Sequence, residues 1–211
     1  MLTRLLFIRH GESAHSVDGT VGGPRGDHGL TPRGHDQARV LAGRLATSVG
    51  SGASVYSSVL RRAVETAAPI AAALGASAVT DCGLCTWHQP AYADGLPTAR
   101  FQAEHAVAGG GVFRPFEEGN ETWAELVARV GRATMDIAHR HAGGTAVVVG
   151  HSETVEASFH VQGGQPLYRA FDLSVANASV TEWSTDTDPT GWPPARWTLR
   201  RFNVSPASSG Q

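Results

Sequence analysis

Three short apolar runs, each followed directly by arginine or histidine, constrain this chain of 211 residues more than any other feature. The runs end at Arg9 and His10 (after LLFI), at Arg61 and Arg62 (after SVYSSVL), and at His151 (after TAVVVG). Parallel strands of an open α/β sheet present their carboxyl ends at one edge, where ligands bind. The three runs therefore predict a crevice that holds two imidazoles and at least one guanidinium.

These residue types suit the chemistry of phosphoryl groups. Arginine binds phosphate oxygens bidentately, and a neutral imidazole is a competent nucleophile. We therefore expect a phosphotransfer enzyme. The formal net charge of -2 gives no field that would attract nucleic acid or an anionic membrane. The expected partner is a small phosphorylated metabolite, with no nucleic acid and no membrane involved.

The chain contains no lysine, so all 17 basic residues are arginines. A Walker-type P-loop, a pyridoxal phosphate enzyme and a protein kinase each need a particular lysine. The sequence excludes these three classes. Biased nucleotide composition of the gene is a sufficient explanation for the missing lysine, and the exclusions hold either way.

The two cysteines, Cys82 and Cys85, form a single CGLC pattern. Such a pair can be a redox couple or half of a zinc site, but no second CxxC follows and proline-rich sequence comes after it. We expect two reduced thiols, no bound metal, no cofactor and a cytoplasmic location, where thiols stay reduced. No apolar run is long enough to predict a signal peptide or a membrane-spanning helix.

Periodicity predicts one α/β domain over residues 1–204 and a disordered tail at 205–211. Residues 82–119 lose periodicity, and we expect them to form an insertion that covers the sheet as a lid. Two stretches near the end alternate as edge strands would. The expected strands are 2–8, 54–57, 78–80, 145–149, 179–183 and 197–203. The expected helices are 32–50, 60–74, one from 121 to about 141 that Asn120 caps, and one that begins at Glu153.

Four motifs in chain order resemble those of the histidine phosphatase superfamily, in its phosphoglycerate mutase-like branch. They are RHGES at 9–13, LTPRGHDQA at 30–38, SSVLRRAVETA at 57–67 and GHSE at 150–153. The resemblance spans most of the chain. It implies an α/β fold, a three-layer α/β/α sandwich around a mostly parallel sheet with a mixed edge, which agrees with the periodicity.

By this resemblance, His10 is the nucleophile that becomes phosphohistidine, and Arg9 beside it binds the phosphoryl oxygens. Arg62 matches the second arginine that binds phosphate. His151 matches the second histidine, which would stabilise charge in the transition state. Ser16 stands where the family often has asparagine, and it is a further candidate for phosphate binding.

The nucleophile and its surroundings carry physical requirements of their own. His10 must be neutral to attack, with one ring nitrogen held so that its tautomer is fixed. The carbonyl oxygen of Gly11 is the natural partner. Fixed arginines and a second imidazole can offset the charge of a phosphoryl group where other enzymes use magnesium, so we expect a reaction that needs no metal.

The chain departs from the family at the general acid. The family usually has a glutamate in an L-x-E step after the third strand, whereas the sequence LCT places Thr86 there. A proton donor contributes about 10²- to 10⁴-fold in rate. Glu153, two residues after His151, is the preferred substitute, and His88 and Asp94 are weaker candidates. Interaction with a helix dipole is the alternative explanation for Glu153.

The expected activity is hydrolysis of a small phosphomonoester through a phosphohistidine intermediate. One alternative is a phosphotransferase of the phosphoglycerate mutase type, although those enzymes tend to be longer and to keep the glutamate. The other is a weakened phosphate-binding or regulatory protein that lacks the usual acid. Specificity for the alcohol is expected to lie within residues 87–116, and the sequence shows no strong signal for an oligomeric interface.

Overall fold

The computed structural model describes residues 1–168 and 172–205, so most of the predicted tail lies outside the described residues. Six strands form one sheet in the order β3-β2-β4-β1-β5-β6. The pairs from β3 to β1 are parallel, whereas β5 pairs antiparallel with both β1 and β6. The strands are β1 (Thr3–Arg9), β2 (Ser54–Ser57), β3 (Ala78–Thr80), β4 (Thr145–Gly150), β5 (Val180–Thr185) and β6 (Thr198–Val204).

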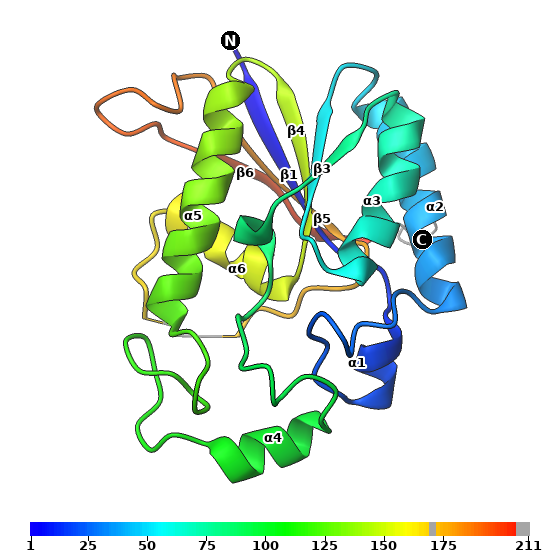
Figure 1. The fold of residues 1–211 in the computed structure, drawn as a ribbon. Helices are drawn as coiled ribbons and strands as arrows, with labels where there is room; N and C mark the ends of the chain where they lie inside the picture. Colours follow the sequence, from blue (N-terminus) through cyan, green and yellow to red (C-terminus); the bar gives the residue numbers. More distant parts are fainter. Residues whose placement is uncertain (169–171, 206–211) are drawn as a thin grey trace.

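Helices cover both faces of this sheet (Figure 1). The helices α2 (Pro32–Ser48) and α3 (Arg61–Leu74) lie on one face. The helices α5 (Trp123–Arg140) and α6 (Ser152–Val161) lie on the other. The predicted three-layer α/β/α sandwich with a mostly parallel sheet and a mixed edge is confirmed. None of the helices in the two described ranges is both long and apolar enough to cross a membrane.

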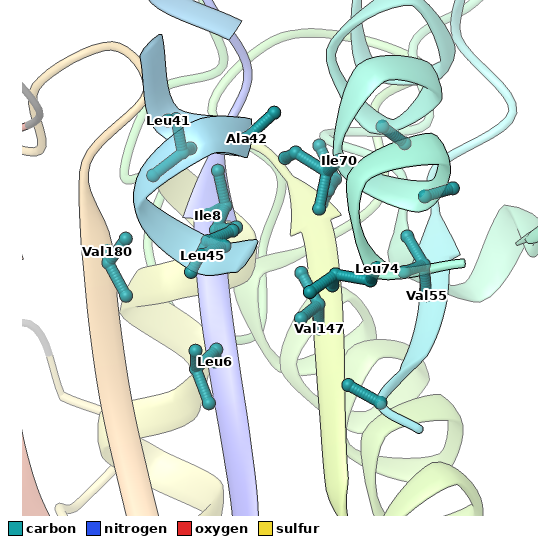
Figure 2. Packing of buried hydrophobic residues seen from close by; sticks show 14 of the residues in the cluster. Leu6, Ile8, Leu41, Ala42, Leu45, Val55, Ile70, Leu74, Val147 and Val180 are labelled. Atoms are coloured by element: carbon teal, nitrogen blue, oxygen red, sulfur yellow. The ribbon is translucent and has the colours of Figure 1, made fainter. Parts of the chain in front are cut away.

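The central strand β1 contributes to two cores at once. Leu6 and Ile8 pack with residues of α2 and α3 (Figure 2), whereas Leu5 and Phe7 belong to the core on the opposite face. Successive side chains of a strand point to opposite faces. A strand covered on both faces is therefore apolar throughout, which is why β1 is recognisable in the sequence as an unbroken apolar run.

Helix α5 begins later than the sequence predicts. The expected cap, Asn120, uses its side-chain amide to donate to the carboxylate of Glu117 at 2.8 Å. Thr122 is the actual cap, because its hydroxyl accepts from the backbone N–H of Glu125 at 3.2 Å. The Glu125 carboxylate in turn accepts from the backbone N–H of Thr122 at 2.7 Å. This reciprocal capping box satisfies two backbone donors, which one asparagine side chain cannot do.

Two further expectations are corrected. Strand β5 is not an edge strand, because it lies between β1 and β6 and all six of its residues are buried. Within the segment 82–119, where no helix is expected, α4 (Thr98–His105) forms with a single buried residue, Phe101. One buried position cannot produce the apolar periodicity by which helices are recognised. In Figure 1 this helix lies beyond the end of the sheet.

The chain after β1 forms a glycine-rich loop, residues 13–30, whose two ends meet each other. Ser13 and Leu30 form an isolated antiparallel bridge, and the backbone N–H of Ala14 donates to the carbonyl oxygen of Gly29 at 3.0 Å. Between these residues the short helix α1 (Ala14–Asp18) forms, which the sequence does not predict. The segment is therefore a closed loop whose two ends are joined.

Two glycines let the chain after β1 touch the first turn of α2. A Cβ on Gly11 would lie 2.6 Å from the carbonyl oxygen of Gly34, and a Cβ on Gly34 would collide with the carbonyl oxygen of Glu12. Real Cβ atoms do not approach backbone this closely, so only glycine fits at either position. This contact fixes the backbone on which His10 stands.

Gly34→Ala should lower the free energy of unfolding by about 1–3 kcal/mol, because the new methyl group overpacks a rigid backbone contact. Gly43→Ala, on the same helix, is the matched control. A Cβ at Gly43 meets no atom within 4 Å, so this change should stabilise the helix by about 0.5–1 kcal/mol. Urea unfolding of both variants measures the two effects. Equal shifts of the same sign would contradict the close approach.

Candidate active site

His10 lies directly after β1, and the contacts of its two ring nitrogens show which of them carries the proton. It is buried, its Nδ1 is 2.7 Å from the carbonyl oxygen of Gly11, and its Nε2 is 3.2 Å from Nε of Arg62. A carbonyl oxygen only accepts and a guanidinium N–H only donates. Nδ1 therefore carries the proton and Nε2 carries the lone pair. The Gly11 contact is the one that the sequence predicts.

Burial keeps both imidazoles of the site uncharged. Desolvation lowers the pKa of His10 well below the ordinary histidine value, and the guanidiniums of Arg62 and Arg9 lower it further. The pKa of His151 is also well below its ordinary value, first because of burial and then because of Arg62. Neutral His10 has the protonation state that a nucleophile needs.

Arg62, at the start of α3, is buried together with a carboxylate partner. Its Nη1 lies 3.0 Å from Oδ2 of Asp27 and donates to the carbonyl oxygen of Gly22 at 2.8 Å. The same Asp27 oxygen accepts from the backbone N–H of Arg62 at 3.1 Å. Burial lowers the pKa of Arg62 and Asp27 raises it. Asp27 is a site residue that the sequence analysis missed, since an acid in a glycine-rich loop carries no distinguishing pattern.

Arg9, at the end of β1, directs one N–H to the carbonyl oxygen of Val175. Its buried Nε has no hydrogen-bond partner among residues 1–168 and 172–205. Buried N–H groups are nearly always paired in folded proteins, so an orphan of this kind marks a place for a ligand acceptor. The structure thus gives Arg9 a donor that an anion can use.

His151 follows β4 and faces His10. The centroids of the two rings are 5.2 Å apart, with the rings edge to face. Nε2 of His151 lies 3.0 Å from Oγ of Ser58, which in turn is 3.2 Å from Sγ of Cys85. The ends of β1, β2 and β4 therefore meet, as the sequence predicts. Ser58 was not singled out, although it lies within the motif SSVLRRAVETA.

The structure brings Glu153 into contact with Thr86, the residue that the resemblance aligns with the family's glutamate. The hydroxyl of Thr86 donates to Oε2 of Glu153 at 3.0 Å. Glu153 is half-buried in the first turn of α6, and its charge raises the pKa of both Arg9 and Arg62. The carboxylate is therefore close to the guanidiniums of the site, while its place in the first turn also fits the helix-dipole alternative.

Ser16 contacts this arrangement only through its neighbour among the contacts of residues 1–168 and 172–205, because its hydroxyl is 3.3 Å from Nε2 of His15. Ser16 is exposed on α1, where its hydroxyl is 2.9 Å from that of Ser13. His15 instead has its ring centroid 6.3 Å from that of His10. Burial, with a further contribution from Arg62, lowers the pKa of His15 to about 4. His15 is a second site residue that the sequence did not reveal.

The two weaker candidates for the acid have other partners. Asp94 accepts from the backbone N–H groups of Arg25 and Gly26, each at 2.8 Å. It therefore ties the segment 82–119 to the glycine-rich loop. His88 has its Nε2 3.5 Å from Sγ of Cys82. Neither contact directs the side chain at His10.

A pocket of about 320 Å³ adjoins these residues. Its walls come from the glycine-rich loop, from the two residues just before α3 and from the segment 82–119. Apolar side chains dominate the lining. The lining residues are Gly22, Gly23, Pro24, Arg25, Val59, Leu60, Cys82, Cys85, Thr86, Trp87, His88, Gln89, Pro90, Ala91 and Asp94.

The family model of the histidine phosphatase superfamily (branch 1) matches residues 5–203 of this chain. A protein of Mycobacterium tuberculosis described as bifunctional is 30% identical over 192 residues, which cover 87% of this chain and 51% of that protein. The chain thus spans about half the length of this curated relative. A putative phosphoserine phosphatase of Hydrogenobacter thermophilus is 28% identical over 184 residues, covering 86% of this chain and 89% of that protein.

Solved structures share the fold over nearly the whole chain. A mycobacterial glucosyl-3-phosphoglycerate phosphatase complexed with VO3 superposes with a TM-score of 0.78 at 24% identity, covering 96% of this chain and 99% of that one. A phosphoserine phosphatase of Entamoeba histolytica, complexed with 3-phosphoglyceric acid, gives a TM-score of 0.73 at 22% identity, with coverages of 96% and 98%. At these identities the likeness establishes the fold.

The buried histidines should make the protein sensitive to acid. In the unfolded chain His10 and His151 protonate near pH 6.5, whereas their lowered pKa values keep them neutral in the folded state well below that pH. The unfolded state therefore binds more protons, and stability falls as the pH drops below about 6.5, by up to about 1.4 kcal/mol per pH unit for each histidine.

Urea unfolding at several pH values between about 7 and 5 tests this dependence. His10→Gln should show a shallower loss of stability, because one of the protons taken up on unfolding is lost. His139→Gln removes an exposed histidine and should keep the slope of the unchanged protein. Equal slopes in all three proteins would show that His10 titrates normally.

Proposed function

Because the chain belongs to the histidine phosphatase superfamily (branch 1), we propose that it hydrolyses a small phosphomonoester through a phosphohistidine at His10. The observation that carries the proposal is the fixed lone pair on Nε2 of His10, 3.2 Å from Nε of Arg62. A nucleophilic nitrogen and a guanidinium for the phosphoryl oxygens thus stand at one point. Arg9 and His151 supply the remaining donors.

In the first step, Nε2 of His10 attacks phosphorus and the bond between phosphorus and the ester oxygen breaks. The proton stays on Nδ1, which donates a hydrogen bond to the carbonyl oxygen of Gly11. This hydrogen bond stabilises the positive imidazole that forms. The charge on the phosphoryl oxygens is offset by Arg9, Arg62 and a ring N–H of His151. These groups do the work that a magnesium ion does in other phosphotransfer enzymes, so this step needs no metal.

We assign the proton transfers to Glu153. In its protonated form it donates to the departing alkoxide, which leaves as the alcohol. The resulting carboxylate then accepts a proton from water as that water attacks the phosphohistidine. Inorganic phosphate is released, and His10 and Glu153 return to their starting states. The hydrogen bond from Thr86, at 3.0 Å, supports this assignment because it holds the carboxylate beside the residue that replaces the family's glutamate.

The size of the pocket supports a small substrate. Its volume of about 320 Å³ is at the lower end of the range for small-molecule sites. The names of the similar proteins, phosphoserine phosphatase and glucosyl-3-phosphoglycerate phosphatase, refer to small phosphorylated compounds. We therefore infer that the substrate is a small phosphorylated metabolite whose alcohol part lies against Trp87 and its neighbours.

The chain should release nitrophenolate from p-nitrophenyl phosphate without added metal, and His10→Ala should abolish this turnover because it removes the proposed acceptor of the phosphoryl group. Quenching the reaction in alkali should trap phosphate on the histidine of the unchanged protein alone. His139→Ala, at an exposed histidine, is the matched control and should turn over normally. Turnover that survives in His10→Ala would reject the phosphohistidine route.

This experiment also separates the alternatives that the sequence leaves open. A phosphoenzyme that passes its phosphate to an added alcohol rather than to water would indicate a phosphotransferase of the mutase type. Phosphate binding with neither turnover nor phosphoenzyme would indicate the weakened binding protein that the threonine at position 86 suggests.

Glu153→Gln should affect substrates according to their leaving group. For an alkyl phosphate, whose alkoxide must be protonated as it leaves, we expect a loss of about 10²- to 10⁴-fold in kcat. For p-nitrophenyl phosphate the loss in the first step should be small, because nitrophenolate leaves without a proton. Glu104→Gln, at an exposed glutamate, should change neither rate. An equal loss with both substrates would remove Glu153 from the acid role.

A further inference from the structure

Three metal-binding side chains lie together at the wall of the pocket, outside the proposed phosphoryl site. The sulfur atoms of Cys82 and Cys85 are 3.7 Å apart, and Nε2 of His88 is 3.5 Å from the sulfur of Cys82. All three ligand atoms lie within 4.8 Å of one another. In residues 1–168 and 172–205 no other cluster of three cysteine, histidine or acidic side chains has its ligand atoms this close together.

Two of these three separations match those of a tetrahedral zinc site. With Zn–S bonds of about 2.3 Å and a Zn–N bond of about 2.0–2.1 Å, tetrahedral angles place two sulfur ligands about 3.8 Å apart and a sulfur and a nitrogen about 3.6 Å apart. The two distances between ligand atoms that the structure gives fall within about 0.1 Å of these values. The third distance, from Sγ of Cys85 to Nε2 of His88, is at most 4.8 Å, so coordination of one ion by all three groups needs at most a small movement of the His88 side chain.

The surrounding residues hold this geometry in place. The guanidinium of Arg129 donates to the carbonyl oxygens of Cys82, Cys85 and Thr86 at 3.2, 3.0 and 3.0 Å. Arg129 also pairs with the carboxylate of Glu121, at 3.2 Å from its Nε. One contact network thus fixes the turn that carries both cysteines.

The same network reaches the third ligand. The Glu121 carboxylate accepts from the backbone N–H of His88 at 2.8 Å. Outer contacts of this kind orient metal ligands and are part of a functional site. Cys82 and His88 are exposed and Cys85 is buried, so an ion from solution can reach the cluster while one ligand remains anchored in the protein.

The charge states of the ligands are compatible with a metal ion. Burial lowers the pKa of His88, and Arg129 lowers it further, so the imidazole is neutral at neutral pH. Burial raises the pKa of Cys82 while Arg129 lowers it. Zinc binding must therefore displace the thiol protons, as it does in other thiolate sites.

We propose that Cys82, Cys85 and His88 form a binding site for one zinc ion, with the fourth coordination position open to the pocket. The pocket lining contains all three residues. Two thiol protons would leave to solvent as the two thiolates coordinate. The ligand set shares no residue with the proposed phosphoryl site, although Cys85 reaches His151 through Ser58, whose Oγ is 3.2 Å from Sγ of Cys85 and 3.0 Å from Nε2 of His151. The proposal revises the expectation of two ordinary thiols.

Zinc titration of the reduced protein by calorimetry tests the proposal, with Co²⁺ as an optical probe for thiolate coordination. We expect one zinc per chain and a charge-transfer band with cobalt. Cys82→Ser and His88→Gln should each weaken zinc binding by at least about 10- to 100-fold, the loss that substitution of outer contacts alone produces. Both positions are exposed, so both variants should fold, which circular dichroism checks. His139→Gln is the matched control and should bind zinc unchanged.

Two results would overturn the proposal. One is the absence of stoichiometric zinc binding by protein in which a thiol reagent shows both cysteines to be reduced. The other is equal affinity in the unchanged protein and in both ligand variants, which would place any bound zinc elsewhere. Because binding is measured without turnover, a failed zinc titration and a failed phosphatase assay are distinguishable.

Discussion

The burial of a charged guanidinium at Arg62 is the constraint on which the rest of the site depends. A buried cation requires a paired anion and satisfied hydrogen bonds, and here Asp27 and the carbonyl oxygen of Gly22 meet both needs. Both partners belong to the glycine-rich loop, so compensating the charge also fixes that loop. The remaining Nε–H then points at His10. One electrostatic requirement thereby positions the loop, the nucleophile and the donor that faces it.

The uncharged state of His10 follows from the same burial. Two guanidiniums and a second imidazole stand around a ring that water does not solvate, so a further positive charge there is strongly unfavourable. An opposite charge close to the ring would reverse this effect. The carboxylate of Asp27 is instead paired with Arg62. Because the Asp27 carboxylate is paired with Arg62 and not with His10, the His10 imidazole remains neutral, with a proton on one nitrogen only.

The parts of this structure that can be predicted from sequence are those that depend on repetition. The strand β1 is buried on both faces, which gives an unbroken apolar run in the sequence. The helix α2 is buried on one face, which gives apolar residues at a helical period. The convergence of Arg9, His10, Arg62 and His151 follows from a general rule about the ends of parallel strands. None of these predictions needs a distance.

The parts that escaped prediction depend on single contacts between distant segments. Asp27 lies in irregular backbone and His15 in the short helix α1, and only the folded chain brings them to Arg62 and His10. The partnership between Thr86 and Glu153 joins residues 67 positions apart. A carboxylate on helix α6 thus reaches the Thr86 side chain of the segment 82–119. A motif of consecutive residues cannot represent such a contact.

The closed loop between Ser13 and Leu30 has a consequence for how members of such a fold can diverge. Its ends are joined to each other, so a change in its length would cost only a slowly growing entropy of loop closure. The loop is nevertheless held at two further points, because Thr20 bridges Pro97 and Asp27 pairs with Arg62. Variation in its length should therefore be accompanied by variation in the segment 82–119, which carries Pro97.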